Sequence, residues 1–233
     1  MLPRFLLSLA AITVALFSAG CAVKPQNPVE LNSEALKTSR SEVGVAMTQL
    51  PKVEVHLPGA DCLLCIAFAS AANSDLRKHA DTLTLEELSS LKQDIVSTLK
   101  KRDIDAVLIE APLDLKTFPE LRSSDTNTAS RNFSSLKSKY NVDRLLVIDV
   151  NAVGFQRNYS AYIPTSDPKG LLRGTGYIVN LTSHTYEWYL PVNVLKSADG
   201  KWDEPGKFPG LTNAYFQALE FGKDEFLRPL ASK

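Results

Sequence analysis

Two cysteines three positions apart, Cys62 and Cys65, are the residues of this chain best spaced for chemistry. They follow the Pro58-Gly59 break and open an alanine-rich apolar run. A CxxC pair at the start of a helix is typical of thiol–disulfide exchange, because the helix N-terminus stabilises the first thiolate. We expect a helix capped by Asp61. A structural disulfide or two buried thiols is the favoured role, with redox catalysis as the alternative. If the run were instead a strand, the two cysteines would face opposite sides and could not bond.

The rest of the sequence offers no catalytic or metal-binding set. His56, His79 and His184 fall in separate expected elements, without the spacing of zinc ligands. No Gly-x-Ser-x-Gly motif is present, and Gly174-Thr-Gly176 lacks the third glycine of a dinucleotide fingerprint. We therefore expect no catalytic residue, no metal, no cofactor and no enzymatic activity.

Two loops rich in proline and large rings, 158–170 and 199–210, are the candidate binding segments. Their large rings are Tyr159, Tyr162, Trp202 and Phe208. Ordered aromatic loops often bind partners, since rings offer much contact area at small entropic cost. The alternative is that the rings fold back and cover the ends of the core.

The apolar patterns predict the elements that must position these residues. A capping box at 84–87 and an apolar stripe predict a helix over 84–99. Further helices are expected over 129–140 and from 212 to 229, and strands over 43–47, 53–57, 106–109, 142–155, 171–181 and 185–195. Trp188 should be buried, on one strand face with Tyr186 and Leu190. The order predicts an α/β (α+β) fold: a single mixed β-sheet packed by helices, ending in an antiparallel meander and a C-terminal helix.

The beginning of the chain has the features of a secretory signal. Arg4 precedes an apolar stretch over 5–17, too short to span a bilayer, and small residues follow. The segment resembles a bacterial lipoprotein signal, with Ala19, Gly20 and Cys21 matching the lipobox. The resemblance implies that Cys21 is lipidated and becomes the new N-terminus. Ala22 after it implies sorting to the outer membrane.

Composition and charge describe one domain behind this signal. We expect a signal peptide over 1–20, a lipidated N-terminus and flexible tether over 21–42, and a single globular domain over 43–233. The chain has 26 basic and 26 acidic residues and no basic block. This balance argues against nucleic acid or an anionic membrane surface as the partner.

The second half of the chain is similar to a periplasmic module. The segments are Val142-Asp143-Arg-Leu-Leu-Val, then Val179 to Trp188, and the closing amphipathic helix. They resemble the group that contains the curli-secretion lipoprotein CsgG, the amino-terminal domain of TolB and lipoprotein activators of penicillin-binding proteins. Asn180 stands where that group has Asp. The resemblance implies a fold and brings no catalytic residue.

The sequence therefore predicts a non-enzymatic protein, lipid-anchored at Cys21 on the periplasmic face of the outer membrane. Its domain is expected to bind or organise another envelope component, a protein or a glycan. The alternative function is a periplasmic thiol–disulfide oxidoreductase that uses Cys62 and Cys65.

Overall fold

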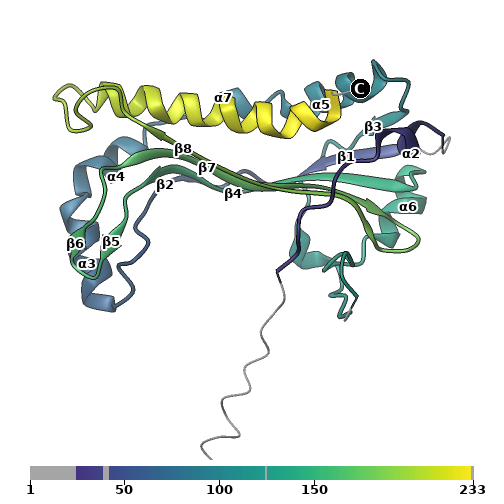
Figure 1. Ribbon diagram of the computed structural model, residues 1–233, viewed down its shortest axis with the longest axis horizontal. Coiled ribbons are helices and arrows are strands. Elements are labelled where there is room, and N and C mark those ends of the chain that lie inside the picture. Colours follow the sequence, from purple (N-terminus) through teal and green to yellow (C-terminus); the bar gives the residue numbers. More distant parts are fainter. Residues whose placement is uncertain (1–24, 39–41, 124, 232–233) are drawn as a thin grey trace, which may run out of the picture.

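A mixed sheet with helices on both of its faces forms the framework of the protein (Figure 1). The computed structural model describes residues 25–38, 42–123 and 125–231. The sheet order is β3-β1-β4-β7-β8, and β2 pairs with β4 beyond the end of β1. The strands are β1 (Val43–Met47), β2 (Val53–His56), β3 (Ala106–Leu108), β4 (Arg144–Gln156), β7 (Lys169–Asn180) and β8 (Tyr186–Ser197). The first three run parallel to one another or to β4, whereas β4, β7 and β8 form an antiparallel meander, as the sequence predicts.

The long C-terminal helix covers one face of the sheet and completes the main core. The helices are α2 (Ser33–Thr38), α3 (Leu63–Ala72), α4 (Ser74–Ala80), α5 (Leu91–Lys100), α6 (Ser134–Tyr140) and α7 (Pro209–Ala231). Helices α5 and α7 lie on the same face of the sheet (Figure 1). Trp188 is 2% exposed and belongs to one buried cluster with Tyr215 and Phe226 of α7. The prediction that Trp188 is a core residue is confirmed.

The opposite face is covered at one end by α6 and the segment before it. Phe133 and Leu136 pack there with Leu145 and Val147 of β4 in a second buried cluster. We call this end of the sheet the body. The two clusters place apolar side chains on both faces of the first half of β4, which explains why that strand begins as a continuous apolar run.

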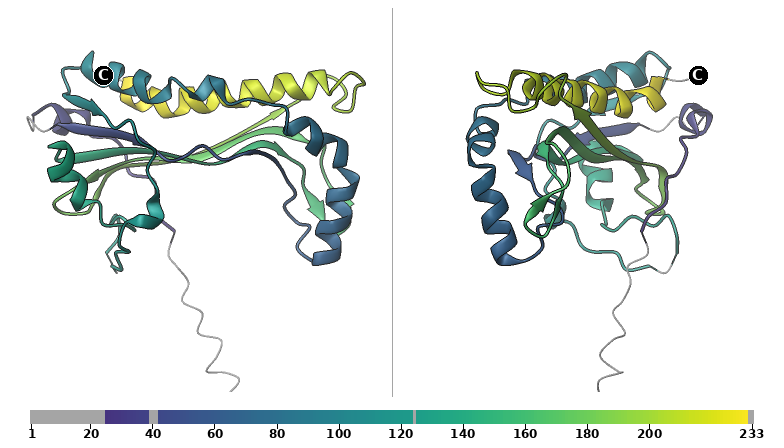
Figure 2. Two further views of the ribbon diagram at one scale, coloured as in Figure 1. Left: turned by 180° about the vertical axis from the view of Figure 1, so that it is seen from behind. Right: turned by 60° about the vertical axis from the view of Figure 1, so that its left-hand side comes forward.

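At the other end of the sheet a projection extends away from α7 (Figure 2). We call it the arm. It consists of β2, α3, α4 and the small hairpin of β5 (Tyr159–Ser160) and β6 (Ile163–Pro164). Strands β4 and β7 remain paired from the body to the arm, up to Gln156 and Lys169. The arm is therefore joined to the body by continuous strands.

Two local predictions are corrected by the structure. The helix expected from residue 84 begins at Leu91, after a 3-10 turn over Glu86–Leu88, and the capping box does not form. The Thr84 carbonyl oxygen instead accepts a hydrogen bond from the Tyr215 hydroxyl (2.7 Å). Helix α7 was expected from 212 to 229, but it begins at Pro209 and ends at Ala231. Pro229 is tolerated inside the helix because it lies in the last turn, where the one amide hydrogen bond that proline lacks costs little.

The face of Tyr186 is a further correction. The register between β7 and β8 shifts next to Trp188, so that Ile178 pairs with Trp188 and Val179 with Tyr186. The shift breaks the alternation, and Tyr186 packs on the second cluster, with Tyr177 and Tyr189, rather than beside Trp188.

The prediction of a flexible tether was wrong for residues 25–38. The backbone of Val29 exchanges two hydrogen bonds with that of Tyr189, of 2.9 and 3.0 Å. Leu36 of α2 is buried in the main core. These contacts fix the segment before β1 on the domain. The predicted signal peptide and Cys21 lie outside the described residues.

Candidate functional site

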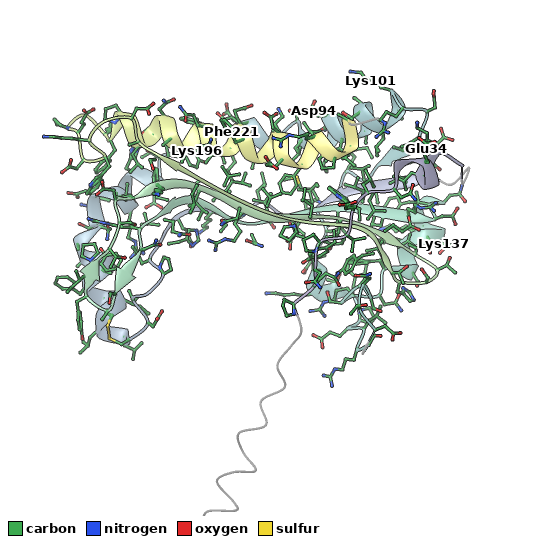
Figure 3. The ribbon with its side chains drawn as sticks, in the orientation of Figure 1. Glu34, Asp94, Lys101, Lys137, Lys196 and Phe221 are labelled. Atoms are coloured by element: carbon green, nitrogen blue, oxygen red, sulfur yellow. A yellow bond between two sulfur atoms is a disulfide. The ribbon has the colours of Figure 1, made fainter. Side chains whose placement is uncertain are left out.

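Cys62 and Cys65 form a disulfide at the start of α3. Cys62, rather than the predicted Asp61, is the N-cap, and its sulfur accepts a hydrogen bond from the Cys65 amide (3.0 Å). Cys65 is buried together with Ala69 one turn later, and both pack against Tyr159 of the hairpin. The disulfide thus lies where α3 packs against the hairpin, at the end of the arm that is farthest from α7 in Figure 3.

The remainder of α3 exposes an apolar surface on most of its sides. Leu63 is 87% exposed, Leu64 72% and Phe68 55%, and Ile66 is also exposed. Only Cys65 and Ala69 of this helix are buried. No residue from 62 to 73 is charged. A helix that is apolar all round normally lies inside a protein or a membrane.

The neighbouring hairpin extends this surface. Tyr162 and Ile163 are exposed, and the Tyr162 ring meets the edge of Phe68 at 6.1 Å between centroids. The Tyr162 hydroxyl lies 3.7 Å from Cys62 Sγ. We call this surface the apolar tip; it consists of Leu63, Leu64, Ile66, Phe68, Tyr162 and Ile163.

The predicted binding rings are divided by the structure. Tyr162 belongs to the apolar tip, but Tyr159 is buried, and its hydroxyl accepts a hydrogen bond from Asn73 Nδ2 (2.7 Å). Trp202 and Phe208 are half-buried, stack on each other at 6.1 Å, and pack against the main core. Three of the four rings therefore fold back onto the domain, which is the alternative that the sequence left open.

Arg157 links the two aromatic loops to the arm. Its Nη1 donates to Asn73 Oδ1 (3.1 Å), and its guanidinium carbon lies 4.8 Å from the Trp202 ring centroid. Asn73 is itself 3% exposed and also donates to the Ala69 carbonyl oxygen. This network holds α3, the hairpin and the 199–210 loop in one arrangement.

His79 of α4 completes the packing beneath these loops. Its ring lies 5.5 Å from that of Phe208, and its Nε2 is 2.7 Å from the Thr212 hydroxyl. Burial, and secondarily the positive charge of Lys207, lower the pKa of His79 below its usual 6.5. The imidazole is therefore held in its neutral form.

This burial predicts a pH dependence of stability. The unfolded chain gains a proton at His79 near its ordinary pKa, while the folded chain resists protonation, so acid favours unfolding. The contribution is complete above the unfolded pKa and is lost as the pH falls toward the folded pKa. His79→Gln should reduce the loss of stability between about pH 7 and 5, measured by urea melts. Parallel pH profiles for the two proteins would contradict this role.

No metal or catalytic centre emerges elsewhere in the described ranges. They hold no group of three or more His, Cys, Asp or Glu residues that fits a metal ion. Within the same ranges no helix has the length and apolarity needed to cross a membrane. The apolar tip is the candidate site, because contiguous exposed apolar residues mark sites of interaction in proteins. Most of it was missed by the sequence reading, although the charge-free run over 62–73 was visible there.

Comparison with known proteins gives no family. No family model and no curated protein matches the chain. Solved structures with a similar arrangement include the PelC dodecamer from Paraburkholderia phytofirmans, with 10% identity, TM-score 0.34, and 89% of this chain and 96% of that chain covered. Protein XCC0632 from Xanthomonas campestris shares 12% identity, with TM-score 0.38 and coverage of 87% and 90%. Lipoprotein GNA1162 from Neisseria meningitidis shares 10%, with TM-score 0.32 and coverage of 77% and 96%.

Likenesses at these values carry no argument about function. The resemblance to the CsgG and TolB group is not shown by them and remains a prediction from sequence.

Proposed function

We propose that this protein is a non-enzymatic, lipid-anchored protein of the bacterial cell envelope, held at the outer membrane by Cys21 and facing the periplasm. Its domain binds another envelope component through the apolar tip. The exposure of six large apolar or aromatic side chains on one end of the arm carries the binding part of the proposal. The signal and lipobox over 1–21 support the anchor.

The apolar tip is unusual for a surface with no function. Exposed apolar residues that occur singly need no explanation, but contiguous ones mark sites of interaction. Here the side chains come from α3 and the β5–β6 hairpin and meet at Phe68 and Tyr162. The disulfide and the Asn73 network fix both segments in place. Because the tip lacks charged groups, it fits a component with an apolar surface better than a glycan.

Cys21→Ser is expected to prevent lipidation and to leave uncleaved precursor or a soluble species. The fold should be unchanged, because Cys21 lies outside the globular domain expected over 43–233. Membrane fractionation and the intact mass, with and without globomycin, measure the effect. An intact mass of the unmutated protein that shows no attached lipid would refute the anchor, whichever fraction the mutant enters.

A photoreactive benzoylphenylalanine at position 68 tests the binding part in intact cells. We expect ultraviolet light to produce adducts from position 68. Phe221 of α7, on the opposite side of the sheet, is the matched control, since it is the same residue with 47% exposure (Figure 3). Equal yields at the two positions, or none at position 68, would refute binding through the tip.

A second function is favoured by one observation. Cys62 is exposed at the N-terminus of α3 and Cys65 is buried, which is the arrangement that thiol oxidoreductases use. The alternative is therefore a periplasmic thiol–disulfide oxidoreductase. The reduction potential of the pair decides between the two functions: a disulfide below about −300 mV is structural, and a clearly higher value favours catalysis.

A further inference from the structure

We propose that the component bound by the apolar tip is the lipid bilayer itself: α3 and the hairpin insert into the acyl-chain boundary of the membrane that carries the Cys21 anchor. This inference rests on the proposed function, because it takes the anchor as given and names the partner of the same site. The occupant is thus a lipid surface, and not a second protein or a second copy of this chain.

The position of the chain's beginning supports a membrane at the tip. The described chain begins at Pro25, and this dark purple segment leaves the domain on the side of the sheet away from α7 (Figures 1 and 2). The arm extends on that same side in every view. After cleavage before Cys21, four residue steps separate the lipidated residue from Pro25, a reach of at most about 14 Å. An anchor so close to the domain brings this side of it to the membrane.

The chemistry of the tip fits hydrocarbon. Neither 62–73 on α3 nor 159–164 on the hairpin contains a charged residue. Charged residues occur only beyond these two segments, with the exposed Asp61 just before α3 and Asp75 in the first turn of α4. Tyr162, with an apolar ring and a polar hydroxyl, is a residue type enriched at the boundary between lipid and water.

Several backbone amides of the tip form internal hydrogen bonds, which suits a medium without water. Unpaired amides are costly in lipid, so inserted segments must form their own hydrogen bonds. In the first turn of α3, the Cys65 amide donates to Cys62 Sγ and the Ile66 amide to the Cys62 carbonyl oxygen (2.8 Å). In the hairpin, Tyr159 and Ala161 donate to the carbonyl oxygens of Pro58 and Gly59. The disulfide keeps this turn closed, which assigns it a structural role in insertion.

Vesicle binding of the mature chain, residues 21–233 with Cys21→Ser, tests the inference without the lipid anchor. The probe is dioleoylphosphatidylcholine vesicles, whose zwitterionic surface leaves apolar insertion as the source of binding. We expect co-sedimentation, weakened at least about tenfold by Leu64→Ser and again by Phe68→Ser, because each removes a large exposed apolar side chain from the contact. Phe221→Ser, matched in type and exposure, should bind as the parent does. Thermal melts check that each variant is folded.

A second measurement applies to the lipidated protein in vesicles of brominated phosphatidylcholine. Tryptophan at position 64 should be quenched by the bromines, whereas tryptophan at position 221 should not, each compared with the parent that contains Trp188 and Trp202. Quenching at neither position, or equally at both, overturns insertion even when binding of the unlipidated chain is weak.

The remaining outcomes separate this inference from the proposed function. Adducts of position 68 with lipid support insertion, and adducts with a protein leave the proposed function standing but overturn insertion. A vesicle-free dimer that Leu64→Ser converts to a monomer, together with no vesicle binding, assigns the tip to a second copy and also overturns it. Vesicle binding together with an unmutated protein whose intact mass shows no lipid would retain the tip and remove the anchor.

Discussion

Trp188→Ala is expected to lower the free energy of unfolding by about 3–5 kcal/mol, the range for a large buried aromatic residue. Trp188 is 2% exposed and faces Ile178 across the β7–β8 pair. The edges of the Trp188 and Phe226 rings lie over Gly176. Because glycine has no side chain, Gly176 cannot fill the space that the Trp188 ring would leave. A cavity at this point lies between the sheet and α7, and both are too well anchored to close it. Urea melts of the purified variant measure the loss.

Trp202→Ala is the matched comparison, because it removes the same side chain from a half-buried site. The ring loses its stack on Phe208 and the contact with Arg157, for which we expect about 1–2 kcal/mol. Equal losses for the two variants, or a larger one for Trp202→Ala, would show that core and surface have been assigned the wrong way round.

Gly154→Ala is the second substitution for which we expect a large effect, at least about 3 kcal/mol. Gly154 has φ +123°, which strains any residue with a side chain. An added Cβ would also overlap the carbonyl oxygen of Glu54, the residue that pairs with Gly154 between β2 and β4. The backbone of β2 would have to move away, and α3 and α4 follow β2 in the chain.

Gly206→Ala separates the two causes. Gly206 has a similar left-handed φ of +92°, but no atom lies within 4 Å of an added Cβ. This control should lose only about 1 kcal/mol, from backbone strain alone. Chemical denaturation of both variants gives the comparison, and a Gly154→Ala protein as stable as Gly206→Ala would mean that β2 and β4 do not approach so closely.

The fold was predictable wherever the burial of a residue repeats along an element. The continuous apolar start of β4 predicted a central strand, and the apolar stripe of α5 predicted a helix. Both predictions are confirmed, because each pattern depends on residues that are close in the sequence. Residues 25–38 gave no such signal, because their attachment depends on isolated contacts with distant residues: the backbone bridge between Val29 and Tyr189 and the burial of Leu36 in the main core. The capping box at 84–87 does not form, and the Thr84 carbonyl oxygen is instead bonded to the hydroxyl of Tyr215, 131 positions away, a contact that local sequence does not indicate.

The candidate site was predictable in part, for the same reason. The spacing of Cys62 and Cys65 and the choice of a helix for the run after them depend on neighbouring residues only. Whether a ring in a loop is exposed depends on partners far away in sequence. Tyr159 is buried against Cys65 and Ala69 and accepts a hydrogen bond from Asn73, 86 positions distant, whereas Tyr162, three residues later, is exposed. Composition alone does not distinguish two such tyrosines.

The unbroken pairing of β4, β7 and β8 has a mechanical consequence. Their ladders run from Arg144 and Asn180 in the body to Gln156 and Lys169 in the arm, with two irregularities, one between Val150 and Ala152 and one between Ile178 and Val179. Strands of 12 and 13 residues span roughly 40 Å. A hinge between body and arm would have to break these hydrogen bonds together, so the arm acts as a rigid lever. Whatever holds the tip therefore also sets the angle at which α7 is presented on the far side of the sheet.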